Sequence, residues 1–296
     1  MSNPIYAGVE LGGTKCVTIL ARGPEDVIDR KVVPTIAPEE TLGPIEEILR
    51  EWQSLHGFEA LGIASFGPVD LDEQSASYGH IVRTSKPGWS DTDVARRLER
   101  ACGVPMAFDT DVNGAALAEM RWGAGRGMQD FAYITVGTGV GVGLVVNGKP
   151  TRGFAHSELG HIRVARLDGD DFPGSCPYHG DCVEGLASGT ALKARLADRS
   201  FDELPDNNPL WEAVGWTLAQ LCHVIVCAAA PRKIAMGGGV MDRQPHLIER
   251  VNQMLEQSLN GYMLLPGGGA YVRPPELGSN AGPLGAIALA MSAVSA

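Results

Sequence analysis

The feature that most constrains the fold is a hairpin pattern that occurs twice along the chain. Two β-rich runs flank a glycine-rich turn in IYAGVELGGTKCVTILAR, residues 5–22, and again in DFAYITVGTGVGVGLVV, residues 130–146. Apolar runs joined by a short glycine turn are typical of β-hairpins. Strand-like and helix-like segments follow both hairpins. The sequence therefore predicts an α/β fold with two lobes, each a copy of a βββαβα arrangement, and a cleft between them.

The segments that follow the hairpins alternate between strand and helix patterns. Further strands are expected at residues 27–35, 60–67, 105–110 and 233–239. Helices are expected where apolar residues recur at helical spacing, namely at 41–56 with Thr41 as the N-cap, 91–103 with Gly103 past the end, 111–123, 211–230, 246–261 and from about Ala281.

The charge of the chain argues against one class of function. Its 296 residues include 24 Lys and Arg against 35 Asp and Glu, a net charge of −11. Nucleic-acid binding requires a basic face that displaces counterions, so we expect no nucleic-acid partner. No apolar run approaches the roughly 20 residues of a membrane span. The start MSNPIYAGVE has no secretory signal pattern, and we expect a cytoplasmic protein without a membrane partner.

The two glycine turns resemble phosphate motifs that they do not satisfy. GVELGGTK comes within one residue of a Walker A loop, but Lys15 stands one position late. In VGTGVGVG, residues 136–143, the glycines mimic a dinucleotide fingerprint. Both motifs require a following helix whose N-terminus binds the anion, and a β-rich run follows each turn instead. We reject both interpretations.

A tight glycine hairpin can hold an anion in another way, because its consecutive backbone N–H groups form a concave nest. The first turn offers Gly12, Gly13, Thr14 and Lys15, and the second offers Gly137, Thr138 and Gly139. Two such turns could face one polyphosphate across the cleft. A third turn, GGGV at 237–240, could lie under a purine or ribose. The alternative is that the glycines mark sharp turns and nothing more.

The segment FDTDVNGAALAE, residues 108–119, places Asp109 at a strand end and Asp111 at a helix start. Asp is among the best N-cap residues, and by composition alone capping is the favoured interpretation of Asp111. A carboxylate at the end of a strand beside a phosphate cleft is also where a base for phosphoryl transfer would stand. Neighbouring residues can hold both roles.

The stretch SCPYHGDCVEG, residues 175–185, is a candidate metal loop. With the end of HSELGH, residues 156–161, it supplies His161, Cys176, His179 and Cys182. Two imidazoles and two thiolates are a tetrahedral set that zinc prefers, and four protein ligands leave no open position, so the site would be structural. A disulfide is disfavoured in a reducing compartment. A surface thiol pair with incidental histidines and a nucleophilic cysteine are the remaining alternatives.

Two carboxylates would be fixed beside this loop. Glu158 precedes the candidate ligand His161 by three residues, and Glu184 follows the candidate ligand Cys182 by two. They could reach the hydroxyl groups of a polyol, or they could be solvated loop charges.

Together these motifs resemble those of the ROK sugar kinases, and most of all the bacterial fructokinase branch. GVELGGTK, SFGPVD, SKPGW, DTDVNGAALAE, YITVGTGVGVG, HSELGH, CPYHGDCVEGLASG, GGGVM and LGSNAG match in order and spacing over nearly the whole chain. The resemblance implies the two-lobed actin-like (hexokinase-like, ribonuclease H-like) ATPase fold, which closes on ATP and sugar. It places the smaller lobe at 1–112 plus 283–296 and the larger lobe at 113–282, with the zinc loop at about 156–185.

The resemblance also implies a role for each matching residue. Asp111 is the general base that takes a proton from the sugar hydroxyl. The turns 12–15 and 137–139 approach the ATP phosphates, and Gly238 with Gly239 lies near the adenosine. The sugar pocket is lined by Thr110, Asp111, Glu158, His161 and Glu184, and zinc is held by His161, Cys176, His179 and Cys182.

Two positions depart from the wider family pattern. Glucokinase members usually have Asn before the catalytic Asp, whereas Thr110 stands there in this chain, which favours fructose over glucose. Glu10 occupies a position that is commonly Asp, and its expected role is on a magnesium-bound water.

The expected reaction is ATP + D-fructose → ADP + fructose 6-phosphate, with Mg²⁺, structural Zn²⁺ and a homodimeric assembly. A kinase for mannose, glucose or an N-acetylated amino sugar is the nearest alternative. A sugar-responsive repressor of the same family would carry an N-terminal helix-turn-helix domain, for which the first turn at residue 12 leaves no room. A non-catalytic sugar-sensing protein is the third alternative, and the presence of Asp111 and Lys15 argues against it.

Overall fold

The computed structural model describes residues 4–197, 199–267 and 270–294. The chain divides into two compact units. Unit 1 consists of Met1–Gly127, Thr151–His156 and Ser279–Ala296, and unit 2 consists of Met128–Pro150 and Ser157–Gly278. The expected lobe boundaries at residues 112 and 283 stay a prediction.

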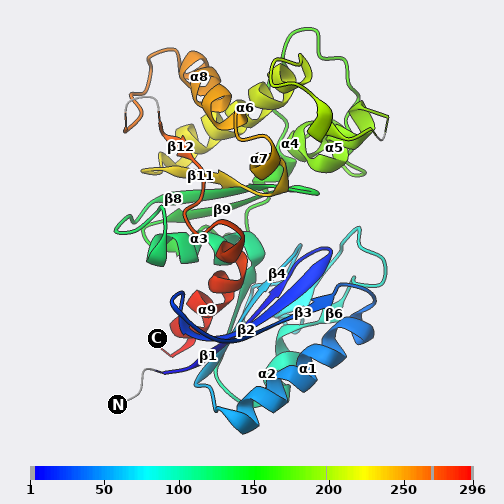
Figure 1. Cartoon of the computed structure of the whole chain (residues 1–296), viewed down its shortest axis with the longest axis vertical. Helices are drawn as coiled ribbons and strands as arrows, with labels where there is room; N and C mark the ends of the chain where they lie inside the picture. Colours follow the sequence, from blue (N-terminus) through cyan, green and yellow to red (C-terminus); the bar gives the residue numbers. More distant parts are fainter. Residues whose placement is uncertain (1–3, 198, 268–269, 295–296) are drawn as a thin grey trace. The chain divides into compact units, whose positions relative to one another are not determined.

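Each unit contains a five-stranded mixed sheet, and the two sheets share one strand order (Figure 1). The order is β3-β2-β1-β4-β7 in unit 1 and β10-β9-β8-β11-β12 in unit 2. In unit 1, β1, β2 and β3 pair antiparallel, and β4 and β7 join the sheet by parallel pairing. In unit 2, β8, β9 and β10 pair antiparallel, and β11 and β12 join by parallel pairing. The predicted duplication is therefore confirmed. The strands are β1 (Tyr6–Leu11), β2 (Lys15–Gly23), β3 (Asp26–Pro34), β4 (Ala60–Ser65), β7 (Met106–Thr110), β8 (Phe131–Val136), β9 (Val140–Val146), β10 (Lys149–Pro150), β11 (Ile234–Gly237) and β12 (Val272–Arg273), with the separate pair β5 (His80–Ile81) and β6 (Thr92–Asp93).

The strand register brings the glycine turns to a defined edge of each sheet. The β1–β2 hairpin closes at the pair Leu11↔Cys16, and the β8–β9 hairpin closes at Val136↔Val140. Since β1 is parallel to β4, and β8 is parallel to β11, each turn lies where parallel strands end. Ligands of α/β sheets commonly bind outside this edge.

Helices cover the sheets in both units (Figure 1). Unit 1 contains α1 (Pro38–Leu55), α2 (Ala95–Cys102), α3 (Asp111–Trp122), η3 (Gly278–Asn280) at its boundary and α9 (Ala281–Ala293). Unit 2 contains η1 (Leu159–His161), α4 (Val183–Ala187), α5 (Gly189–Arg195), η2 (Phe201–Glu203), α6 (Leu210–Ala229), α7 (Gly239–Arg243) and α8 (Leu247–Leu259).

The predicted start of α1 was wrong. The helix begins at Pro38, because proline is well suited to the first helical position, where its missing N–H would have no partner within the helix. Thr41 therefore lies inside the helix instead of capping it. Its buried Oγ1 accepts the Ile36 N–H at 2.9 Å and donates to the Pro34 carbonyl at 3.3 Å. Those bonds fix the approach from β3.

Helix α2 ends before a left-handed Gly103, as predicted, but its predicted start at residue 91 was wrong. It begins at Ala95, because Thr92–Asp93 form the short strand β6.

Close backbone contacts hold α9 against the sheet of unit 1. A Cβ on Gly62 of β4 would overlap the Ala286 carbonyl, and one on Gly8 of β1 would lie 2.9 Å from the Ala286 Cβ. A Cβ on Gly285 of α9 would lie 2.4 Å from the carbonyl carbon of Gly114 in α3, so Gly285 has no room for a side chain. This packing fixes the start of α3 at the sheet edge.

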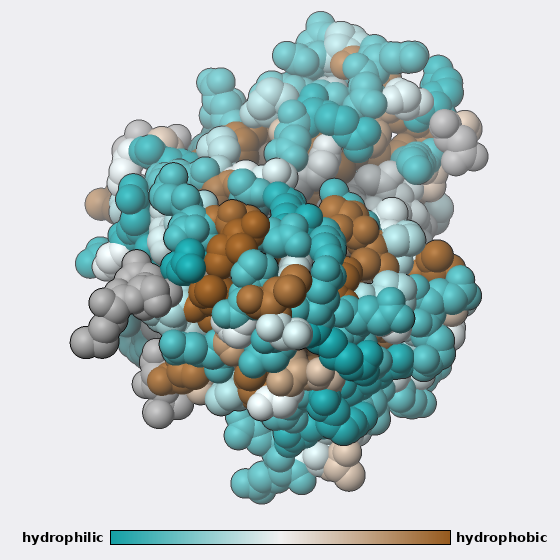
Figure 2. All heavy atoms as spheres, turned by 60° about the horizontal axis from the view of Figure 1, so that its bottom comes forward, coloured by the Kyte–Doolittle hydropathy of each residue, from teal (hydrophilic) through white to brown (hydrophobic). Residues whose placement is uncertain are grey.

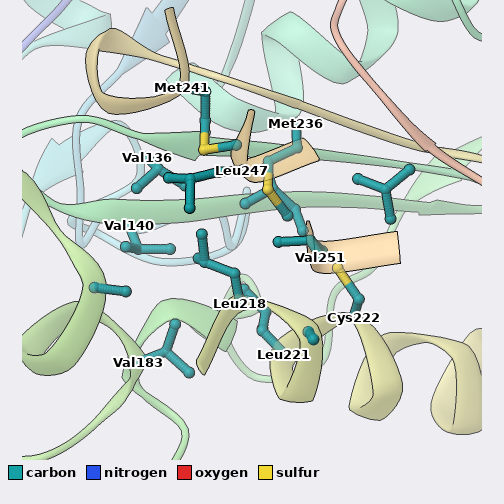
Figure 3. Close-up of a cluster of buried hydrophobic side chains, with 14 of the residues drawn as sticks. Val136, Val140, Val183, Leu218, Leu221, Cys222, Met236, Met241, Leu247 and Val251 are labelled. Atoms are coloured by element: carbon teal, nitrogen blue, oxygen red, sulfur yellow. The ribbon is translucent and has the colours of Figure 1, made fainter. Parts of the chain in front are cut away.

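The core of unit 2 lies between its sheet and the helices α4, α6 and α8 (Figure 3). Val136 and Val140 enter it from the sheet, Val183 from α4 and Leu218 from α6. The expectation that no apolar run approaches the length of a membrane span was wrong for α6, which is the single helix among the described residues that is long and apolar enough to cross a membrane. However, 61% of its apolar window is buried inside the protein. Such burial is typical of a core helix.

One face of the molecule is mostly hydrophilic. In the view of Figure 2, hydrophilic residues occupy most of the surface and hydrophobic residues form separate patches. Large exposed apolar side chains include Leu55, Phe154, Tyr262 and Leu264. Scattered exposed apolar residues are normal and do not by themselves indicate a binding site.

Gly62→Ala tests the packing of α9 on the sheet. The added methyl group overlaps a helix carbonyl that cannot move alone, so we expect the free energy of unfolding to fall by about 1–3 kcal/mol. Gly43→Ala in α1 is the control, since nothing lies within 4 Å of an added Cβ there. In a helix it should be neutral or stabilising by up to about 1 kcal/mol. Urea unfolding of both variants is the measurement, and equal stabilities would contradict the packing argument.

Candidate active site and metal centre

A pocket of about 510 Å³ lies beside the second glycine turn in unit 2. It is lined by Gly137, Thr138, Gly189, Thr190, Lys193, Arg199, Ser200, Phe201, Gly239 and Arg243. The predicted residues Gly137, Thr138 and Gly239 therefore share one pocket. Gly139 and Gly238 belong to the same two turns without lining it. Gly238 has φ +96, and a Cβ there would lie 2.7 Å from Thr135 Oγ1, so the third turn requires glycine.

The pocket has a cationic lining that the sequence analysis missed. Lys193, Arg199 and Arg243 line it, and its described lining includes no Asp or Glu. Arg243 lies 4.2 Å from the centroid of the Phe201 ring and donates from Nε to the Gly239 carbonyl at 2.8 Å. Cations of this kind bind phosphate oxygens through charge-assisted hydrogen bonds. The three cations share no motif in the sequence, and only the tertiary fold brings them together.

Glu184 lies against the second glycine turn. Its Oε2 accepts the Val140 N–H at 3.0 Å, and a Cβ on Gly139 would overlap the same oxygen. Glu184 was predicted to line the sugar pocket, and that role stays a prediction. The observed contact gives it a second role at the start of β9, which the sequence spacing did not indicate.

The first glycine turn, in unit 1, is held through its carbonyl groups. Thr35 Oγ1 donates to the Gly12 carbonyl at 2.8 Å, and the Thr35 N–H donates to the Thr14 carbonyl at 3.0 Å. Lys86 Nζ donates to the Gly13 carbonyl at 2.6 Å. Lys86 therefore adds a second cation beside Lys15. It belongs to the SKPGW motif, which was a signal in the sequence, although no role was assigned to it there.

Glu10 is a partly buried carboxyl group in β1, close to the first turn of α9. A Cβ on Gly282 would overlap its carboxylate, so glycine is required for this approach. Burial raises the pKa of Glu10 to about 7, although the positive charges of Lys15 and Arg30 act in the opposite direction. A bound cation would favour the ionised form of such a group.

Asp109, Thr110 and Asp111, at the junction of β7 and α3, make different contacts. Thr110 Oγ1 accepts the Asn113 N–H at 3.2 Å, so Thr110 is the N-cap and the capping interpretation of Asp111 is wrong. Asp109 is 1% exposed and accepts hydrogen bonds from Asn113 Nδ2 at 2.7 Å and Arg152 at 2.5 Å. Asp111 is the first helical residue, and its Oδ1 accepts the adjacent Val112 N–H at 2.9 Å.

The four predicted metal ligands form one cluster in unit 2. Cys176 Sγ lies 3.7 Å from Nδ1 of His161 and 3.7 Å from Nδ1 of His179. Cys182 Sγ lies 3.6 Å from His161 Nδ1, and all four potential ligand atoms lie within 4.8 Å of one another. Both cysteines are free thiols.

The spacing of the cluster fits a tetrahedral zinc ion. Zn–S bonds of about 2.3 Å and Zn–N bonds of about 2.0–2.1 Å give S···N distances of about 3.6 Å. The distances in the cluster are 3.6 and 3.7 Å. Burial raises the pKa of the Cys182 thiol to about 11, so metal binding has to displace a proton from it. The donor set and its geometry therefore suit a structural zinc.

A buried ion pair ties the loop before Cys176 to α5. Arg195 donates to both carboxylate oxygens of Asp170, at 2.7 and 2.8 Å, and lies 4.3 Å from the Phe172 ring centroid. The hydrogen bonds from Arg195 lower the pKa of Asp170. The two side chains are 8% and 9% exposed. The loop is thus anchored to the same helix whose other residues line the pocket.

The predicted site residues fall into two groups. Unit 1 contains Glu10, the first turn, Thr110 and Asp111, and unit 2 contains the other two turns and the Cys/His cluster. Glu158 is exposed in unit 2, and its carbonyl accepts the His161 N–H at 3.0 Å. The assignment of these residues to substrates stays a prediction.

Known proteins resemble the chain over its whole length. The ROK family model matches residues 6–293. A fructokinase of Zymomonas mobilis is 41% identical over 293 residues, which are 98% of this chain and 97% of that protein. A ROK hexokinase from Thermus thermophilus has a TM-score of 0.80 at 29% identity, covering 98% of this chain and 99% of that one. A ROK glucokinase from Streptomyces griseus, solved with glucose and AMPPNP, has a TM-score of 0.77 at 26% identity, covering 97% and 99%.

Glu10→Gln tests the effect of burying this carboxyl group. Its folded pKa, about 7, lies above the ordinary value of 4.5, so the folded protein binds this proton more tightly than the unfolded chain. Stability is therefore lost as the pH rises from 4.5 to about 7. We expect the variant to raise the free energy of unfolding at pH 8 by up to about 3 kcal/mol. Denaturant unfolding in magnesium-free buffer at pH 8 and pH 4.5 is the measurement, and an equal effect at both pH values would contradict the argument.

Proposed function

Because the chain belongs to the ROK family and has its actin-like ATPase fold, as predicted, we propose that it is an ATP-dependent fructokinase. It transfers the γ-phosphoryl group of ATP to O6 of D-fructose. The likeness to the Zymomonas mobilis fructokinase, which spans nearly all of both chains, carries this proposal. Thr110 beside the proposed base supports fructose over glucose.

Asp111 is the proposed general base. It accepts the proton of the fructose O6 hydroxyl, the O6–phosphorus bond forms, and the bond from phosphorus to the bridging oxygen of ADP breaks. Thr110 caps α3, so the Asp111 side chain is not required as the cap. The N-terminus of a helix also favours a negative charge at this position. Both observations are compatible with a carboxylate that acts on the substrate while its Oδ1 also accepts the Val112 N–H of the helix.

The pocket of unit 2 is the proposed nucleotide site. Gly137 and Thr138 offer backbone groups to the phosphates, and Gly239 lies near the adenosine. Lys193, Arg199 and Arg243 would neutralise the phosphate charge, which is most of what phosphoryl transfer requires of a protein.

The first glycine turn is proposed to approach the transferring phosphate, with Lys15 and Lys86 as its cations. Glu10 is proposed to hold Mg²⁺ through a water. When bound, Mg²⁺ neutralises charge on the β- and γ-phosphates, and it usually takes one or two protein carboxylates together with substrate phosphates. Gly12 and Gly13 would let the backbone come close to the phosphate oxygens.

The Cys/His cluster is proposed to hold a structural Zn²⁺ that orders the loop around it. Glu158, His161 and Glu184 would then face the sugar hydroxyl groups. Four protein ligands leave no open position, so His161 and the cysteines hold the ion and take no part in proton transfer. Free thiols suit a cytoplasmic location, and a homodimer is the proposed assembly.

A sugar panel tests the substrate. We expect ADP release with fructose to exceed that with mannose, glucose and N-acetylmannosamine in kcat/KM by at least about tenfold, since loss of one well-placed hydrogen bond is worth on the order of 1.4 kcal/mol or more. A coupled ADP-release assay with ATP and Mg²⁺ is the measurement. A higher kcat/KM for another hexose would show that this hexose, and not fructose, is the substrate. An absence of turnover with every sugar would overturn the proposal that the protein is a sugar kinase.

Asp111→Asn tests the general base. The amide cannot accept the O6 proton, so we expect kcat to fall by about 10²–10⁴-fold, with an unchanged circular dichroism spectrum. Asp91→Asn is the matched control, because Asp91 is exposed in unit 1 and has φ 62, a backbone conformation that Asn tolerates. A kcat within threefold of the wild type for Asp111→Asn would exclude Asp111 as the base.

A further inference from the structure

Two short segments connect the Cys/His cluster to the second glycine turn. The first is α4, whose N-cap is Cys182, with Sγ accepting the Gly185 N–H at 3.4 Å. Glu184 of α4 accepts the Val140 N–H at 3.0 Å. The cluster ligand Cys182 is therefore two residues away from a side chain that binds the backbone directly after the turn.

The second segment is η1, which ends at the ligand His161. A Cβ on Gly160 would overlap the Val140 carbonyl, so η1 packs directly on that carbonyl. Val183 N–H also donates to the Ile162 carbonyl at 3.0 Å, which joins α4 to η1. Val140 thus contacts one segment through its N–H and the other through its carbonyl, and each segment carries a cluster ligand.

The start of α5 extends this support to the turn itself. The Gly189 N–H donates to the Gly137 carbonyl at 2.7 Å, and Thr190 Oγ1 donates to the Thr138 carbonyl at 2.8 Å. Gly189 and Thr190 also line the pocket. Val140 and Val183 enter the same core (Figure 3), so a shift of α4 has to be shared by the start of β9.

We propose that a metal ion in the Cys/His cluster positions the second glycine turn through Glu184 and Gly160, so that metal binding and nucleotide binding strengthen each other. Metal–ligand bonds fix His161 and Cys182 at a set distance, which orders η1 and α4 together. The turn is then ordered before the nucleotide arrives, and binding no longer carries that entropic cost. The inference rests on the proposed role of the pocket as the nucleotide site. Glu184 is, in this respect, a positioning residue.

Reciprocity gives this coupling a test that does not depend on turnover. If zinc tightens nucleotide binding by some factor, the nucleotide must tighten zinc binding by the same factor. Coupling between sites is typically about 5- to 150-fold. At the lower end of this range, AMPPNP should bind the zinc-loaded full chain at least about fivefold more tightly than the chelator-treated chain.

The first experiment measures both sides of this cycle in the absence of sugar. Isothermal titration gives the AMPPNP dissociation constant of zinc-loaded and metal-free protein, and competition with a chromogenic chelator gives zinc affinity with and without AMPPNP. Equal AMPPNP binding to the two forms overturns the coupling and leaves the proposed function standing. Failure of the zinc-loaded protein to bind AMPPNP overturns both.

A second experiment keeps the metal in place, which avoids any unfolding of the metal-free chain. Glu184→Ala removes the acceptor for the Val140 N–H, whereas Glu184→Gln keeps one. We expect Glu184→Ala to retain one zinc equivalent by metal analysis but to bind AMPPNP at least about fivefold more weakly, and Glu184→Gln to restore most of the affinity. Asp168→Ala, an exposed carboxylate of the same loop, is the control. Wild-type AMPPNP affinity in Glu184→Ala would overturn the route through Glu184.

Discussion

The edge at which the parallel strands end is the constraint on which the rest of the structure depends. In unit 1 Leu11 pairs with Ser65, and Ser65 pairs with Thr110, so the glycine turn after β1 and the start of α3 lie at one edge. In unit 2 Thr135 pairs with Gly237, which brings the second and third turns together. The pairing of the strands therefore brings together turns that are far apart in the sequence. The side-chain contacts at each turn are made to a backbone that the sheet has already positioned.

The two glycine turns share a backbone plan but differ in their supports. Thr35 and Lys86 hold carbonyl groups of the first turn, and Lys86 is a flexible side chain. The second turn is held by backbone and side-chain bonds from Gly189 and Thr190, and by Glu184 next to it. A lysine can exchange a carbonyl for a phosphate oxygen without moving the fold. The second turn cannot be released without moving α4 and α5, so its geometry depends on whatever orders those helices.

Local patterns predicted the parts of this structure that depend on local chemistry. The hairpins, the strands and the Cys/His cluster follow from residues that are close in the sequence or have a fixed spacing. The N-cap at Thr41 was wrong because its hydroxyl bonds to the approach from β3 instead of the helix. Composition favoured Asp111 as a cap, but Thr110 one position earlier is also a good cap residue, and its hydroxyl accepts the Asn113 N–H. Lys193, Arg199 and Arg243 could not be predicted, because no motif unites them and only packing places them together.

An acidic protein that binds an acidic nucleotide requires a local reversal of charge. The chain carries a net charge of −11, but charges beyond about 8 Å are screened at physiological salt, so the nearest side chains decide the potential in the pocket. Arg243 pairs with Asp202 at 3.3 Å, and both side chains are about half exposed. Such a pair is worth about 0–1 kcal/mol, so Arg243 can exchange Asp202 for a phosphate oxygen at small cost. Its contact with the Phe201 ring would keep the guanidinium in place during that exchange, so the proposed nucleotide phosphate would have to displace only one exposed carboxylate.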